Sequence, residues 1–167
     1  MIDPNQLLGV ARLLAMPPRR GAPQQAKLRR SISSAYYALF HHLLESATIE
    51  LIGANRRQPS YGIVYRSFEH ADLRKSCAQV QLPILAKEVQ KAVGFASFGP
   101  DIRECATFFV ELQQARHEAD YNPVARISLS DARGAIAKAE GAIAALDRAP
   151  AQQRKLFLTL LHFKVRS

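Results

Sequence analysis

One arginine occupies a position where the pattern of the sequence requires an apolar side chain. Apolar residues in segment 100–121 fall at the spacing of one helix face, and Arg116 lies on the same stripe. The apolar members of this stripe are Ile102, Cys105, Phe109, Leu112 and Ala119. Two interpretations are open. Arg116 pairs with a carboxylate such as Glu45 or Glu118, because a buried arginine needs a partner; or its planar set of N–H donors is directed at a phosphate.

A polar stripe runs along segment 27–50, again at helical spacing. Its members are Arg30, Ser33, Ser34, Tyr37, His41 and Glu45. Hydroxyl, phenol and imidazole groups form networks or binding sites when they are partly enclosed. For His41, a structural hydrogen-bonded role and a role as a base near neutral pH are both open. His117 directly follows Arg116, so it points away from the inward stripe and is expected to be exposed.

The sequence gives little support for metal or cofactor chemistry. His42 and Glu45 have the spacing of a ligand pair, but no second pair and no cysteine cluster accompany them. No serine stands in a nucleophile elbow. Segment 94–99, GFASFG, lacks the lysine and the preceding strand of a phosphate-binding loop. We therefore expect neither a metal nor a cofactor.

Helical patterning extends over almost the whole chain, and no segment with the period of a strand exceeds a few residues. Asp3 and Pro4 predict the N-cap and first turn of a helix that reaches Met16. Further helices are expected over residues 27–52, 60–78, 100–121 and 128–149 and from 151 onward, with a weaker helical piece at 80–93. The expected fold is all-α, an up-and-down bundle of five to six helices. It forms one domain over 1–167, with a core at about 24–148 and flanking helices at 3–16 and 151–165.

Segment 27–50 is expected at the centre of this bundle. Its predicted inward residues are Leu28, Ile32, Ala35, Tyr36, Leu39, Phe40, Leu43 and Ala47. In the first helix they are Leu7, Leu8, Val10 and Leu14, and in segment 60–78 they are Ile63, Val64, Phe68, Ala71 and Leu73. The two cysteines, Cys77 and Cys105, also lie in apolar-patterned segments and are expected to be buried, reduced thiols.

The formal net charge is +9, which favours a polyanionic partner or an acidic protein. Arginine and lysine are concentrated in residues 1–60 and near the C-terminus, without the interleaved aromatic residues of a stacking platform for single strands. The apolar run near the N-terminus is too short for a secretory signal or a membrane span. We expect a soluble cytoplasmic protein with no membrane association.

Two segments together resemble the HEPN superfamily (higher eukaryotes and prokaryotes nucleotide-binding). RRSISSAYYALFHHLLE, residues 29–45, is similar to the Tyr-Tyr-Ala-x-Phe-His helix of small bacterial members, and ARHEADYNP, residues 115–123, is similar to their R-x-x-A-D-Y segment. The resemblance covers about 24–148. It implies a dimerising bundle; in ribonuclease members the two motif helices face each other across the dimer and form a composite cleft. Ribonuclease members of the superfamily cleave RNA without a metal ion. Other relatives pair with a small nucleotidyltransferase in toxin–antitoxin systems, so the resemblance also implies such an antitoxin partner.

The chain departs from the ribonuclease motif, in which an arginine is followed by four to six residues and then histidine. Tyr121, Asn122 and Pro123 occupy those positions after Arg116, and a tyrosine whose pKa is about 10 is a poor base at neutral pH. The candidate catalytic residues are therefore Arg116, Tyr121 and His41. The candidate binding residues are Arg30, Ser34, Tyr37, His41, Arg116, His117 and Asp120.

Three functional hypotheses follow. The leading one is a HEPN-like homodimer, non-enzymatic or weakly active, that binds RNA, a nucleotide or a protein partner, as in a toxin–antitoxin system. The second is an active metal-independent endoribonuclease toxin. The third is a structural interaction module whose positive charge meets an acidic protein.

Overall fold

The computed structural model describes residues 2–17 and 24–163, and every regular element within them is an α-helix. The helices are α1 (Pro4–Leu14), α2 (Gln24–Ile52), α3 (Pro59–Arg66), α4 (His70–Val80), α5 (Lys87–Val93), α6 (Pro100–Tyr121), α7 (Leu129–Arg148) and α8 (Ala151–His162). The predicted all-α class is confirmed, although these eight helices exceed the expected five to six. Residues 18–23, between the first two expected helices, and residues 164–165 of the expected last helix lie outside the described residues.

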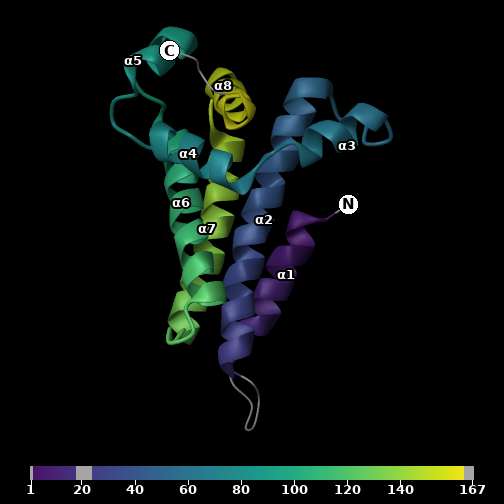
Figure 1. The fold of residues 1–167 in the computed structure, drawn as a ribbon, viewed down its shortest axis with the longest axis vertical. Helices are drawn as coiled ribbons and strands as arrows, with labels where there is room; N and C mark the ends of the chain where they lie inside the picture. The colour runs from purple at the N-terminus through teal and green to yellow at the C-terminus, as the bar shows by residue number, and fades with distance from the viewer. Residues whose placement is uncertain (1, 18–23, 164–167) are drawn as a thin grey trace.

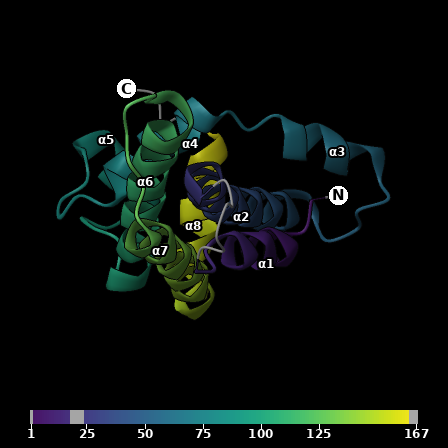
Figure 2. The ribbon, with the colours of Figure 1, turned by 90° about the horizontal axis from the view of Figure 1, so that it is seen from below.

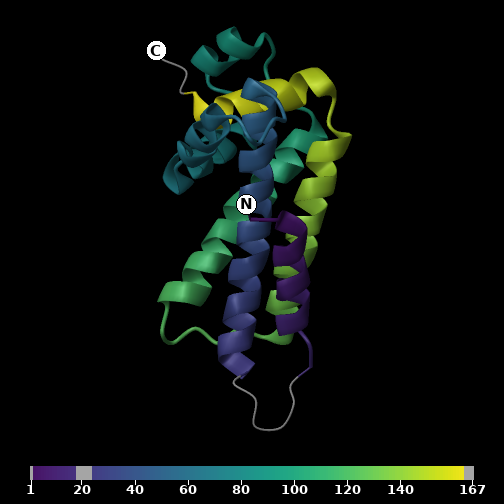
Figure 3. The same ribbon diagram turned by 90° about the vertical axis from the view of Figure 1, so that its right-hand side faces the viewer.

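The long helix α2 is the central element of the bundle. It lies side by side with α1, α6 and α7, and the four helices alternate in direction along the long axis (Figure 1). Seen along that axis, α2 lies between α1 on one side and α6 and α7 on the other (Figure 2). Helix α8 crosses one end of the bundle (Figure 3), where α4 packs against both α6 and α8. This arrangement brings α2, α4 and α6 together.

The ends of the helices follow from local sequence. The Asp3 side chain accepts a hydrogen bond from the Asn5 amide at 2.9 Å, and Pro4 begins α1, as predicted. A capping box joins Ser128 to Asp131 at the start of α7. Gly53, directly after α2, adopts a φ of 84°, which glycine tolerates without steric strain.

The core confirms the predicted inward face of α2. Its buried apolar residues include Leu28, Ile32, Ala35, Tyr36, Leu39, Phe40, Leu43 and Ala47. Three inward predictions in other segments are wrong: Val10 is 44% exposed, Ile63 is 67% exposed and Ala71 is also exposed. Helix α1 buries Leu8, as predicted, together with Ala11, so the face that packs against the bundle is shifted by one residue from most of the predicted one. Cys77 and Cys105 are buried free thiols, and burial is the main cause that raises the pKa of Cys105 to about 12.

The single helix expected over residues 60–78 is wrong, because the chain breaks into α3 and α4. The amide and the hydroxyl of Ser67 both donate to the carbonyl of Val64, at 3.1 and 2.6 Å, which ends α3. Phe68 is buried, and its ring centroid lies 4.7 Å from that of His162 on α8. Burial of Phe68 redirects the chain. Segment 80–93 is likewise helical only from Lys87.

Candidate functional site

Arg116 extends from α6 toward α2 and is held by two polar partners. Its Nη2 donates a hydrogen bond to Tyr37 Oη at 2.9 Å, and its Nε lies 2.9 Å from Asp120 Oδ2. Ser33 Oγ in turn donates to Asp120 Oδ1 at 2.5 Å. The side chains of Arg116 and Asp120 are 22% and 16% exposed. The guanidinium is therefore fixed in orientation but still reaches solvent.

The carboxylate that pairs with Arg116 is not one of the two expected from the sequence. Glu45 forms an ion pair with Arg56, and Glu118 accepts a hydrogen bond from Asn122 Nδ2 at 2.5 Å. Asp120 lies one helical turn after Arg116 on the same helix, so this pairing is local. The expectation that the arginine needs a carboxylate holds, whereas the two named partners are wrong.

Three tyrosine rings surround the guanidinium. Its Cζ lies 5.1 Å from the ring centroid of Tyr121, 5.5 Å from that of Tyr37 and 6.0 Å from that of Tyr36. These are cation–π distances. Burial alone lowers the pKa of Arg116, but Tyr37, Tyr121 and Asp120 more than offset this effect and raise it. Burial raises the pKa of Tyr36 well above its ordinary value, so its hydroxyl stays protonated.

His41 points toward α3 rather than toward Arg116. Its Nδ1 lies 2.7 Å from Tyr65 Oη, and its ring stacks on that of Tyr37 with centroids 6.1 Å apart. Burial, together with the neighbouring His70, lowers the pKa of His41, so it is neutral at pH 7. The contacts fit the structural hydrogen-bonded role that was one of its two interpretations.

His70, the first residue of α4, is a functional candidate that sequence reasoning missed. Its ring stacks on Phe40 with centroids 3.9 Å apart, and its Nδ1 lies 2.8 Å from Tyr36 Oη. The carbonyl of His70 accepts a hydrogen bond from Gln113 Nε2 on α6. Burial lowers the pKa of His70, and the positive charge of Arg116 lowers it further. A neutral imidazole with an exposed edge thus lies near Arg116.

The sequence contained only an indirect signal for His70. Tyr36 lies on the predicted apolar face, and a buried tyrosine hydroxyl needs a hydrogen-bond partner. The partner itself could not be predicted, because it depends on the break at residues 67–69 that turns α4 against α2.

The other predicted site residues divide into two groups. His117 is exposed as expected, and its ring centroid lies 5.1 Å from that of Tyr121, which is 61% exposed. Both lie beside Arg116 on α6. Arg30 is exposed and Ser34 is partly buried on α2. No hydrogen bond or ion pair connects either of them to Arg116 in the part of the chain that the structure describes.

Arg29, the neighbour of Arg30, holds the end of the helix that carries the site. Its Nη1 donates to the carbonyls of Ala119 and Asn122 at 2.7 and 2.9 Å, and its Nη2 donates to that of Ala125 at 2.5 Å. Carbonyls at the end of a helix lack partners within the helix. Arg29 therefore positions the last turn of α6, where Arg116, Asp120 and Tyr121 lie.

A cleft of about 320 Å³ opens between α4 and α6, and Arg116 is one of its lining residues. It is lined by Arg74, Gln113, Gln114, Arg116 and His117. Each of these side chains carries N–H groups that donate hydrogen bonds, and no carboxylate lines the cleft. Such a lining favours an anionic ligand that accepts several hydrogen bonds.

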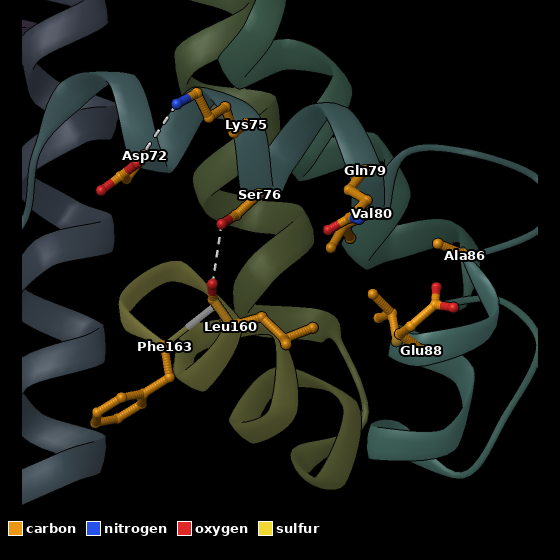
Figure 4. A pocket seen from close by; sticks show the side chains of 10 residues that line it. Asp72, Lys75, Ser76, Gln79, Val80, Ala86, Glu88, Leu160 and Phe163 are labelled. Atoms are coloured by element: carbon orange, nitrogen blue, oxygen red, sulfur yellow. Dashed lines mark hydrogen bonds and ion pairs between the residues drawn. The ribbon is translucent and has the colours of Figure 1, made fainter. Parts of the chain in front are cut away.

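A neighbouring pocket of about 350 Å³ between α4, α5 and α8 has a different character (Figure 4). Its charged lining residues are of both signs: Asp72 and Glu88 together with Lys75. Lys75 lies 3.9 Å from Asp72, and Ser76 donates to the carbonyl of Leu160. Lys75 and Ser76 therefore already have protein partners, and the two carboxylates in the lining do not favour an anion.

Neither a metal centre nor a membrane span is found among residues 2–17 and 24–163. They contain no group of three or more histidine, cysteine, aspartate or glutamate side chains arranged to hold an ion. None of the described helices combines the length and the apolar character needed to cross a bilayer.

The chain matches no protein-family model, no curated protein and no solved structure. Its own residues and their geometry are therefore the basis for any functional conclusion.

Proposed function

We propose that this protein binds phosphate groups of RNA or a nucleotide in the cleft between α4 and α6. The observation that carries the proposal is the composition of the cleft, in which every lining side chain carries an N–H group that can donate a hydrogen bond. Phosphate oxygens accept such bonds, and arginine presents several donors to them at once. The net charge of +9 adds a long-range attraction for a polyanion.

Arg116 has the preorganisation that a phosphate-binding residue needs. Its Nη2 donates to Tyr37, and its Nε forms an ion pair with Asp120 without a hydrogen bond; among the described residues no hydrogen bond engages Nη1. The ion pair with Asp120 offsets part of the charge of Arg116. Arg74, across the cleft, forms no ion pair among the described residues and adds an uncompensated positive charge. The two arginines would therefore have different roles: Arg116 would orient a phosphate, and the positive charge of Arg74 would attract it.

Membership of the HEPN superfamily, homodimerisation and a nucleotidyltransferase-type antitoxin partner are further parts of this proposal. The first part rests on the sequence resemblance. The two segments that carry the resemblance contact each other within one chain, through Arg116 with Tyr37 and Ser33 with Asp120, whereas the resemblance implies a contact across the dimer. Light scattering tests the dimer, with an expected mass of twice 18.6 kDa. A monomer at micromolar concentrations would contradict it.

The binding proposal is tested by fluorescence anisotropy with a labelled RNA oligonucleotide at increasing KCl concentrations. We expect Arg116→Ala and Arg74→Ala each to weaken binding about tenfold and to reduce the slope of log K against log salt by about 0.7 for each lost phosphate contact. Arg12→Ala is the matched control for Arg116→Ala. Like Arg116, Arg12 forms an ion pair with a carboxylate, that of Glu140 on α7, but it does not line the cleft. No binding by the wild type, or equal losses in Arg12→Ala and Arg116→Ala, would contradict the proposal.

A second candidate function, metal-independent RNA cleavage, is favoured by the position of His70. When Nδ1 carries the proton and donates to Tyr36 Oη, Nε2 is left as a proton acceptor near Arg116. The imidazole would take the proton of a ribose 2′-hydroxyl while its oxygen attacks phosphorus. The P–O5′ bond breaks, water supplies a proton to the leaving 5′-oxygen, and a 2′,3′-cyclic phosphate remains. Arg116 would stabilise the charge on the phosphate oxygens.

The cleavage candidate is tested in EDTA with protein in excess over RNA, so that chemistry rather than affinity limits the rate. Its expected result is a 2′,3′-cyclic phosphate product that is lost in His70→Gln and retained in His41→Gln. The rate would fall as the pH drops and the His70 imidazole gains a proton. No cleavage by wild type that still binds RNA would leave the binding function alone.

A further inference from the structure

Tyr121 is a large aromatic residue left open to solvent beside Arg116 and His117, two of the residues that line the cleft. It is the last residue of α6, and 61% of its surface is exposed. One side of its environment is cationic, because Arg116 Cζ lies 5.1 Å from the ring centroid. The ring of His117, one turn earlier on the same helix, lies 5.1 Å away at an angle of 53°. Much of the tyrosine ring therefore remains available to a ligand.

We infer that Tyr121 is a base-stacking platform, so that the cleft takes an unpaired nucleotide of a single-stranded nucleic acid together with its base. The inference rests on the proposed phosphate binding and specifies the ligand. One sugar joins base and phosphate in a nucleotide. A ring 5.1 Å from the guanidinium carbon can therefore contact the base of the same nucleotide whose phosphate Arg116 holds.

The exposed ring selects an unpaired base for a physical reason. In a duplex, both faces of each base are covered by neighbouring base pairs, so a protein ring has no face to stack on. In a single strand, each base can leave its neighbours and stack on an aromatic side chain. Tyr121 also adds no charge, so it should contribute affinity that salt does not weaken.

The role of Tyr121 differs from the catalytic role expected from the sequence. Its hydroxyl needs no perturbed pKa to serve as a platform, because stacking uses the ring face alone. Phenylalanine should therefore replace it, whereas leucine should not, since leucine supplies apolar bulk without a π-face.

The test measures anisotropy of four labelled probes of equal length: single-stranded RNA, single-stranded DNA, duplex RNA and an abasic DNA strand. Wild type, Tyr121→Phe, Tyr121→Leu and Tyr121→Ala are compared, with circular dichroism to verify folding. We expect Tyr121→Ala and Tyr121→Leu to weaken binding of a base-bearing single strand at least about fivefold. Tyr121→Phe should stay within about twofold of wild type, and all four proteins should bind the abasic strand equally.

The outcomes separate this inference from the proposed function. Equal binding of base-bearing single strands by wild type, Tyr121→Leu and Tyr121→Ala would overturn the stacking role while leaving phosphate binding intact. A preference of the wild type for duplex RNA would also overturn it. No binding of any probe would overturn the proposed function itself. Weaker binding of single strands by Tyr121→Ala and Tyr121→Leu would support stacking. If only RNA binding is weakened, the 2′-hydroxyl is also recognised; if RNA and DNA binding are both weakened, it is not required.

Discussion

Arg116 combines two properties that are usually found in different arginines. It is paired with Asp120, which accepts a hydrogen bond from Ser33, and it donates a hydrogen bond to Tyr37, as a structural arginine does. The same side chain nevertheless lines a cleft that contains no acid. A ligand that binds there would meet donors that are already oriented, and little conformational entropy would be lost on binding.

The histidines around this cluster predict how stability depends on pH. Burial is the main cause that lowers the pKa of His41, His42 and His70. Below about pH 6.5 the unfolded chain therefore binds more protons than the folded chain, so stability rises with pH. We expect the free energy of unfolding by urea to be lower at about pH 5 than at about pH 7.5.

Substitution checks that prediction. The double variant His41→Gln/His70→Gln should show a smaller difference between the two pH values than the wild type. His117→Gln is the control, because that side chain is exposed on α6. An unchanged pH dependence in the double variant would show that these two side chains do not cause it.

At the residue scale, sequence reasoning found Arg116 because it interrupts an apolar stripe, and it found Tyr37 because it belongs to an unusual polar stripe. Both inferences depend only on helical periodicity, which is a local property. The partners of these residues depend on side-chain reach and on neighbouring helices. For this reason Glu45 and Glu118 were predicted in place of Asp120, and His70 was missed.

At the scale of elements, the end of α6 determines whether the site is assembled. Arg29 on α2 donates to three carbonyls at and after this end. A cation there also interacts favourably with the helix dipole. The link fixes α6 to α2, and these two helices provide Arg116, Asp120, Ser33 and Tyr37.

Arg29→Gln should therefore destabilise the protein, whereas Arg30→Gln should not. The two arginines are adjacent, but Arg30 is exposed. Since hydrogen bonds from a charged group contribute about 1.5–3 kcal/mol, we expect a loss of that order for Arg29→Gln. Arg30→Gln should change stability by no more than about 0.5 kcal/mol. Thermal unfolding monitored by circular dichroism measures both, and equal effects would contradict the capping role of Arg29.

The long helices were predictable because their patterns are long and regular. Helices α2, α6 and α7 have apolar faces that span many turns; in addition α6 begins with a proline and α7 with a capping box. The break between α3 and α4 was not predictable, because it depends on burial of Phe68 against α8, nearly a hundred residues later in the chain. Tertiary packing overrides local propensity at such positions.

At the scale of the whole molecule, the excess of positive charge predicted a polyanionic or acidic partner but no location for it. None of the described arginines in the first sixty residues lines the cleft between α4 and α6. The described ion pairs also neutralise some of them, including Arg12 with Glu140 and Arg56 with Glu45. The cleft differs from these surfaces because it collects donors without any carboxylate. Its location depends on the packing of α4 against α6, which net charge does not determine.

The most direct test of the account is an NMR titration that observes the arginine Nε–H signals while single-stranded RNA is added. Our account predicts that the signals of Arg116 and Arg74 shift and saturate together, while the signal of Arg12 stays unchanged. Shifts of other arginine signals, with Arg116 and Arg74 unaffected at saturation, would contradict the proposal that the cleft between α4 and α6 binds phosphate.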